Sequence, residues 1–193
     1  MTIPNLGTTA IGQPITRCGI SLFPLYLTDN DLPDIATGPA AGIAIDEMPA
    51  ASVPQLVVTN PTDRPILLVE GEAFVGGQQN RTINVSVLVP SGATLEIPVS
   101  CLERGRWGHG RHFEHGATFT PRRVRRTKQE AVAMSMATAG SRHSNQGAVW
   151  GAIDQELTDL AVQADTRAMA DADATFNRDQ HRFDAVEELS RLG

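Results

Sequence analysis

The first half of the chain is divided into short β-rich runs that recur about every ten residues, and this spacing most constrains the fold. The runs cover residues 20–27, 42–46, 53–59, 65–70, 82–89 and 94–101. Pro24 within the first run indicates an edge position or a bulge, because proline cannot donate to a strand ladder. Turn signals such as residues 60–63 separate the runs. Short strands in this arrangement predict an antiparallel β-sandwich or a barrel-like domain.

The second half changes from a strand period to a helix period. Thr120 is a predicted N-cap, Pro121 fits the first helical position, and Gly140 is a plausible C-terminal stop. Ser144 is predicted to cap a second helix, whose apolar residues recur at helical spacing. That stripe consists of Val149, Trp150, Ile153, Leu157, Leu160, Ala161 and Ala164. Residues 168–174 are predicted to extend it, and Phe183, Val186 and Leu189 mark a last short helix.

Strands followed by helices, without alternation, predict an α+β protein rather than a doubly wound sheet. We expect a β-rich domain over residues 1–118 and a helical segment over residues 119–193 that packs on it. At 193 residues with 41% hydrophobic side chains, the chain is long enough for a sizeable core.

Composition narrows the class of protein. No apolar run approaches the ~18 residues that span a bilayer, and the N-terminus shows no signal-peptide pattern. The chain has two cysteines, Cys18 and Cys101, in no paired motif, so a reduced, cytoplasmic protein without a membrane partner is expected. A net charge of −6 argues against bulk nucleic-acid binding.

The charge is unevenly spread along the sequence. Residues 103–128 hold eight basic side chains against two acidic ones. Almost all are arginines, whose planar forks suit phosphate, although a GC-rich genome would produce the same bias. The basic residues 122–128 lie at the start of the predicted helix, where positive charge is unfavourable because of the helix dipole. This cost indicates that these side chains have negatively charged partners. Those partners would be acidic side chains of the helical half or a bound anion.

Two other patterns point to less specific chemistry. His109, His112 and His115 are spaced for metal binding on a helix, but three nearby glycines favour an exposed, flexible loop. The sequence therefore assigns no metal site and no cofactor. Cys101 is predicted to be a buried thiol at a strand end. The glycine spacing of residues 71–76 resembles a phosphate-binding loop but lacks its Lys and hydroxyl residues, so that motif is rejected.

A polar turn and a polar strand end carry the candidate site. The turn GGQQNR covers residues 76–81, and its two glycines permit positive φ and the close approach of another chain or a ligand to the backbone. The side chains of Gln79, Asn80 and Arg81 follow and supply hydrogen-bond donors and acceptors. Glu72 lies upstream in the same hairpin, and CLERGRW, residues 101–107, ends the next strand. If these strands are neighbours, their polar ends converge at one rim. The rim is then either a ligand site or a buried salt-bridge and amide network.

An ordered set of motifs gives a family resemblance. The motifs are LFPL (22–25), IDE (45–47), SVP (52–54), LLVEGE (67–72), GGQQNR (76–81) and CLERGRW (101–107). Together they resemble the ADP-ribosylglycohydrolase-and-rhodanese-phosphatase-associated protein domain, a prokaryotic and phage family, over about residues 20–150. The resemblance implies an intracellular protein that works near ADP-ribose, NAD-derived nucleotide or phosphoester processing. It supplies no established reaction, and family members often run longer than this chain.

Two hypotheses follow for the function. In the first, the protein binds a small phosphate-bearing nucleotide such as ADP-ribose or an NAD derivative and, in its stronger form, hydrolyses it. Glu72 or Glu103 would be the general base or a metal ligand, and the binding residues would be Gln79, Asn80, Arg81, Arg106 and Trp107. In the second, the same surface is a non-catalytic adaptor for a protein or nucleotide. A third reading, single-stranded nucleic acid on residues 122–128, is the weakest because aromatic residues are missing there.

Overall fold

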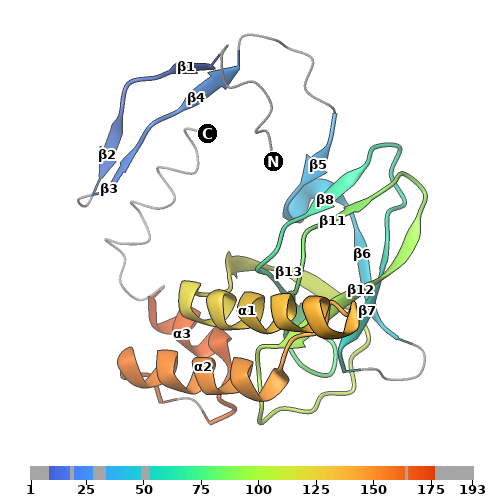
Figure 1. Ribbon diagram of the computed structural model, residues 1–193, viewed down its shortest axis with the longest axis vertical. Helices are drawn as coiled ribbons and strands as arrows, with labels where there is room; N and C mark the ends of the chain where they lie inside the picture. The colour runs from blue at the N-terminus through green and yellow to red at the C-terminus, as the bar shows by residue number, and fades with distance from the viewer. Residues whose placement is uncertain (1–8, 18–19, 28–33, 49–52, 164, 177–193) are drawn as a thin grey trace. The chain divides into compact units, whose positions relative to one another are not determined.

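The computed structural model describes residues 9–17, 20–27, 34–48, 53–163 and 165–176. Its contacts divide the chain into two compact units. One unit combines Met1–Pro33 with Ala174–Gly193, and the other is Asp34–Asp173. We describe each unit by itself (Figure 1).

The smaller unit contains an interrupted antiparallel β-ribbon. Strand β1 (Thr9–Ile11) pairs with β4 (Leu25–Leu27), and β2 (Ile15–Arg17) pairs with β3 (Ile20–Leu22). The single run predicted over residues 20–27 is therefore two strands separated at Pro24. The Pro24 carbonyl accepts a hydrogen bond from Gly12 N at 2.8 Å, which confirms the predicted irregularity at this proline.

The larger unit is built around a six-stranded antiparallel sheet and a three-stranded sheet. The first has the order β13–β9–β10–β12–β7–β6, and the second has the order β11–β8–β5. The bounds are β5 Ala36–Thr37, β6 Ala44–Glu47, β7 Gln55–Thr59, β8 Ile66–Leu68, β9 Glu72–Gly76, β10 Arg81–Ile83, β11 Val87–Val89, β12 Thr94–Cys101 and β13 Phe113–Phe119, with a 3₁₀ turn, η2, at Pro39–Ala41.

The large sheet curls until its two ends meet, which makes it a nearly closed barrel. Asp46 of β6 forms an isolated antiparallel bridge with His112, just before β13. Beside it, Glu47 N donates to the carbonyl of Arg111 at 2.8 Å. The α+β prediction with a barrel-like β-domain is confirmed.

The barrel core consists of side chains from alternate strand positions, as the pleat requires. Its buried members are Ala41, Ile45, Leu56, Val58, Ile66, Leu68, Phe74, Ile83, Val89, Ile97, Val99 and Phe113. On β10, Arg81 lies across from Phe74 on β9 and Cys101 on β12. All three side chains are fully buried. The inner face of the barrel therefore becomes polar at the end nearest the turn between β9 and β10.

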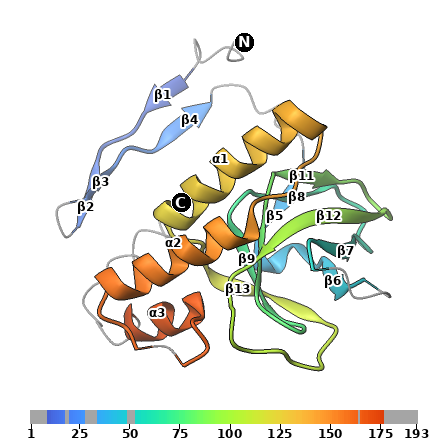
Figure 2. The same ribbon diagram turned by 60° about the horizontal axis from the view of Figure 1, so that its bottom comes forward.

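Three helices follow the strands, and α1 and α2 lie side by side (Figure 2). They are α1 Arg122–Ala139, α2 Gln146–Asp159 and α3 Met169–Phe176. They share a second core, in which Val149, Ile153 and Leu157 of the predicted stripe are buried, whereas Trp150 and Leu160 are partly buried and Ala161, beyond the end of α2, is exposed. Its buried members are Leu102, Val124, Val149, Ala152, Ile153, Leu157, Met169 and Ala172.

The helix ends differ from the prediction in their caps. Pro121 occupies the N-cap of α1 without a side-chain cap, because the Thr120 hydroxyl bonds the Thr82 hydroxyl at 2.8 Å instead. Gly140 ends α1 in the left-handed conformation at φ 64°, as predicted. Asn145, not Ser144, caps α2 by accepting from Ala148 N.

The structure differs from the sequence prediction in three segments. The run predicted over residues 82–89 is β10 and β11 in separate sheets, because buried Asn84 turns away to bond Ser100 and Arg142. The expected flexible histidine loop ends in strand β13, since His115 and Phe113 pack inward. Residues 169–176 form a separate helix instead of extending α2. The helix expected at Phe183, Val186 and Leu189 lies outside the described residues.

Candidate functional site

The turn GGQQNR and the loop CLERGRW meet in one charged network, as predicted. The Glu103 carboxylate accepts two hydrogen bonds from the Arg106 guanidinium, each at 2.8 Å, and a third from Asn80 N at 3.0 Å. Arg106 Nη2 also donates to Asn80 Oδ1 at 3.0 Å, and that oxygen accepts from Gly76 N at 3.1 Å. Glu103 is 3% exposed, so the structure holds its charge by this bidentate pair.

Arg81 lies inside the barrel end, behind that network. Its side chain is 0% exposed, its Nη1 donates to Gln79 O at 3.0 Å, and its Nη2 lies 3.6 Å from Glu47 Oε1. Glu47 also accepts from Gln78 N at 3.0 Å. The carboxylate beside Arg81 is therefore Glu47 of β6, not Glu72 of the same hairpin. The sequence contained Glu47 within IDE, but nothing in its spacing showed that β6 would face β10.

The two glycines of the turn have a packing reason. Gly76 and Gly77 both have positive φ, 126° and 52°. A Cβ on Gly77 would lie 2.1 Å from the ring of Phe113, and one on Gly76 would lie 2.6 Å from the carbonyl of His112. The turn therefore closes over β13 at a distance that no side chain allows.

Cys101 lies beside Arg81 and is fully buried, as predicted. Burial raises the pKa of its thiol, and the adjacent Arg81 charge only partly opposes this rise. A thiol in this state is a poor nucleophile, since the thiolate is the reactive form.

We therefore expect Cys101 to react slowly with thiol reagents in the native protein. A Cys18→Ser variant leaves Cys101 as the only thiol of the chain. Its reaction with an aromatic disulfide reagent should be slow in buffer and complete within minutes in denaturant. Rapid native labelling would show that the barrel end opens to solvent, contrary to this placement.

Glu72 lies apart from the network, at the opposite end of β9. It is four positions from Gly76, which is about 13 Å along an extended strand. Its Oε2 lies 3.7 Å from His115 Nδ1, and the two side chains are 7% and 8% exposed. Glu72 Oε2 and His115 Nε2 have no hydrogen-bond partner among the described residues. The structure thus separates Glu72 from Glu103, and it adds His115, which the sequence placed only in the histidine loop.

A small cavity of about 90 Å³ lies against this pair. It is lined by Gly38, Pro39, Glu72, Ala73, His115, Gly116, Thr118 and Phe119. Strand β13 reaches it through an irregularity between His115 and Phe119, where four positions of β13 match two of β9. Such bulges re-aim side chains and occur often beside functional sites.

The two ionisable groups at the cavity favour their neutral forms. Burial raises the pKa of the Glu72 carboxyl, and a hydrogen bond from the Val69 backbone opposes this only partly. Burial also lowers the pKa of the His115 imidazole. The 3.7 Å separation is within ion-pair range, but a strong ion pair would move both pKa values the other way. Burial thus disfavours the charged form of each of the two groups.

The basic side chains at the start of α1 form ion pairs with acidic residues, as their position near the helix N-terminus predicted. Arg125 and Lys128 both bind Glu70, with Nη2···Oε2 at 2.7 Å and Nζ···Oε1 at 2.6 Å. Arg123 pairs with Asp159 of α2 at 2.5 Å. The predicted acidic partners thus come from the helical half for Arg123 and from the β-half for the other two. Because these ion pairs neutralise much of the segment's positive charge, they argue against the hypothesis that residues 122–128 bind single-stranded nucleic acid.

The remaining predicted residues are more exposed. Trp107 is 58% exposed, so it is not a core aromatic, and Arg106 keeps 38% of its side chain exposed. His112 is exposed and pairs with Asp46 at the barrel seam. Among the described residues no group of three or more His, Cys, Asp and Glu side chains could hold a metal ion.

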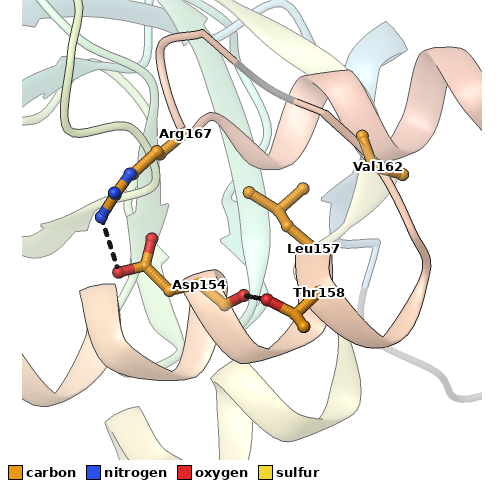
Figure 3. A pocket seen from close by; sticks show the side chains of 5 residues that line it. All are labelled: Asp154, Leu157, Thr158, Val162 and Arg167. Atoms are coloured by element: carbon orange, nitrogen blue, oxygen red, sulfur yellow. Dashed lines mark hydrogen bonds and ion pairs between the residues drawn. The ribbon is translucent and has the colours of Figure 1, made fainter.

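A larger surface hollow lies between α2 and the segment before α3 (Figure 3). It measures about 240 Å³, and Arg167 crosses one side of it to bond Asp154 at 3.2 Å. A neighbouring hollow of about 370 Å³ lies between Arg104, Asp165 and Arg167. The two guanidiniums face two carboxylates, Asp154 and Asp165, so these hollows have no surplus charge for phosphate.

The fold and site define an α+β protein with a nearly closed barrel that ends in a buried charged network. The chain belongs to the family of the ARG and Rhodanese-Phosphatase-superfamily-associated Protein domain, whose family model matches residues 8–192. Comparison with curated proteins and with solved structures found no match. Within the described part of the chain, no helix is long and apolar enough to cross a membrane.

Proposed function

We propose that this cytoplasmic protein binds a phosphate-bearing nucleotide such as ADP-ribose or an NAD derivative and hydrolyses it at the Glu72–His115 cavity. One observation carries the proposal: two buried polar atoms, Glu72 Oε2 and His115 Nε2, lie unpaired beside a cavity. Buried polar atoms are nearly always hydrogen-bonded, so an unpaired pair at a cavity indicates a ligand group. The family description associates the domain with the ARG and rhodanese-phosphatase superfamilies.

Hydrolysis requires a group that gains and loses a proton near neutral pH. Glu72 suits this role because burial moves its pKa up toward that range. Glu103 does not suit it, because its carboxylate already accepts three strong hydrogen bonds. In this proposal Glu103, Gln79, Asn80 and Arg81 hold the barrel end in shape. Arg106 and Trp107 are then the members of the motif that a ligand can contact from solvent.

The proposal is tested by binding and turnover of ADP-ribose and NAD. We expect binding by calorimetry and slow release of product by the purified protein. Glu72→Gln should keep binding and lower turnover by about 10²–10⁴-fold, the usual contribution of a general acid or base. Glu114→Gln, an exposed carboxylate on the same strand as His115, is the matched control and should leave both unchanged.

The alternative function is an adaptor that binds a partner without turnover. The saturated hydrogen bonds of the Glu103–Arg106 network favour it, since that network resembles a structural scaffold more than a reaction centre. Nucleotide binding without turnover, under a range of divalent metals, would support the adaptor. Loss of turnover in Glu72→Gln with unchanged affinity would exclude it.

A further inference from the structure

We propose that the group entering the Glu72–His115 cavity is uncharged: a hydroxyl or carboxamide end of the ligand, not its phosphate. This inference rests on the proposed function and specifies which part of the ligand the cavity recognises. It depends on the charges around the cavity, on the hydrogen-bonding capacity of the two unpaired groups, and on the space.

Among the residues that the structure describes, no free cationic side chain lines the cavity wall. Apart from Glu72 and His115, the lining residues are Gly38, Pro39, Ala73, Gly116, Thr118 and Phe119, and none of them carries a charge. The guanidinium of Arg125 lies 5.8 Å from the Phe119 ring centroid. However, it is already bonded to Glu70 Oε2 through Nε at 3.1 Å and Nη2 at 2.7 Å. A phosphate placed here would be desolvated without a counter-charge, which is costly.

The two unpaired groups match a neutral ligand group. A protonated carboxyl donates one hydrogen bond and accepts others, and a neutral imidazole donates at one nitrogen and accepts at the other. A hydroxyl or a primary carboxamide offers both a donor and an acceptor, so it can satisfy Glu72 and His115 together. A cation would require Glu72 as a buried carboxylate, and burial raises the pKa of that carboxyl.

The space limits what can enter. A cavity of about 90 Å³ holds roughly three water molecules. A whole nucleotide does not fit, so one end of the ligand enters while its phosphates remain outside. The β13 irregularity and the backbone at Gly38 form the wall at this point, and His115 is further fixed by edge-to-face packing on Phe74 at 5.1 Å.

The test compares two ligands that differ at one end: ADP-ribose, which ends in an uncharged sugar, and ADP, which ends in phosphate. Calorimetry on the full chain should give at least tenfold tighter binding of ADP-ribose. Glu72→Gln keeps a donor and an acceptor at the same place, so its affinity for ADP-ribose should stay within about threefold of wild type. Glu72→Ala removes both and should lose at least tenfold.

Other outcomes separate the two proposals. ADP binding as tightly as ADP-ribose, with the ADP affinity lost in Glu72→Ala, would overturn the inference and keep the cavity as the site. Binding of neither ligand would overturn the proposed function and this inference with it. Infrared spectroscopy at neutral pH checks the state of Glu72 without any ligand. A protonated carboxyl band that is missing in Glu72→Gln supports the inference, and its absence in wild type contradicts it.

Discussion

Arg81→Ala is expected to destabilise the protein by about 3–5 kcal/mol, because it leaves the buried Glu47 carboxylate without its counter-charge. Arg81 is 0% exposed and Glu47 is 4% exposed, so water cannot replace the lost guanidinium. The change also empties a large volume at the barrel end. Since a domain has only about 5–15 kcal/mol of stability, the melting temperature should fall by about 10 °C or more.

A matched control is Arg64→Ala, which removes an arginine whose side chain is 48% exposed and pairs with Asp34 at 3.3 Å. An exposed pair of this kind contributes about 0–1 kcal/mol, so its melting temperature should barely change. Arg81→Lys should be intermediate, since a point charge cannot also reach Gln79 and Glu47. An Arg81→Ala protein that melts like wild type would show that the guanidinium is solvated, and would restore Arg81 as a direct phosphate ligand.

Glu70→Ala is the second change with a large expected effect. Glu70 accepts hydrogen bonds from Arg125, Lys128 and Gln129, and it fixes α1 to the barrel. Lys128 is 0% exposed and also donates to the carbonyl of Ile83. Without Glu70, the Lys128 ammonium stays buried without a counter-charge. Chemical denaturation should therefore show a free energy of unfolding that is lower by about 3–5 kcal/mol.

Glu130→Ala provides the control on the same helix, because Glu130 pairs with Arg126 in an exposed i,i+4 contact. It should cost about 0.5 kcal/mol or less. In the double variant Glu70→Ala, Lys128→Met, no buried charge is left, and much of the loss should be recovered. Equal losses in Glu70→Ala and Glu130→Ala would contradict the role of Glu70 in fixing α1 to the barrel.

The Glu70 contribution should also depend on pH. Burial alone would raise the pKa of Glu70, but the hydrogen bonds and charges of Arg125 and Lys128 lower it below the usual 4.5. The stabilisation is therefore complete above about pH 4.5 and is lost as the pH falls through the folded-state value. The difference between wild type and Glu70→Ala should shrink in that acidic range.

The architecture was predictable from local pattern, and the site was predictable only in part. The β-rich run over residues 94–101 gave strand β12, and the stripe from Val149 to Leu157 gave the buried face of α2. GGQQNR and CLERGRW meet because β10 and β12 are antiparallel neighbours. Strand β11 lies between them along the chain but belongs to the other sheet, so chain order alone does not give this pairing.

The missed features depend on contacts between distant segments. Glu47 reaches Arg81 only because the barrel brings the inner face of β6 close to that of β10, and no local period encodes this. His115 was assigned to an exposed loop because glycines surround it, whereas pairing of β13 with β9 buries it beside Glu72. The break within residues 82–89 depends on Asn84, whose partners Ser100 and Arg142 lie on other elements. Polar residues within apolar patterns were thus the least predictable.

The seam of the barrel has a consequence for how the chain reaches this structure. Among the described residues, the seam joins positions 46 and 112, which are 66 apart, through one backbone bridge, one neighbouring backbone hydrogen bond and the Asp46–His112 side-chain pair. Few interactions repay the entropy of closing so long a loop, whereas the adjacent pairs β9–β10 and β10–β12 close much shorter ones. The sheet should therefore assemble outward from β9, β10 and β12 as an open curl, and become a barrel only in its last folding step.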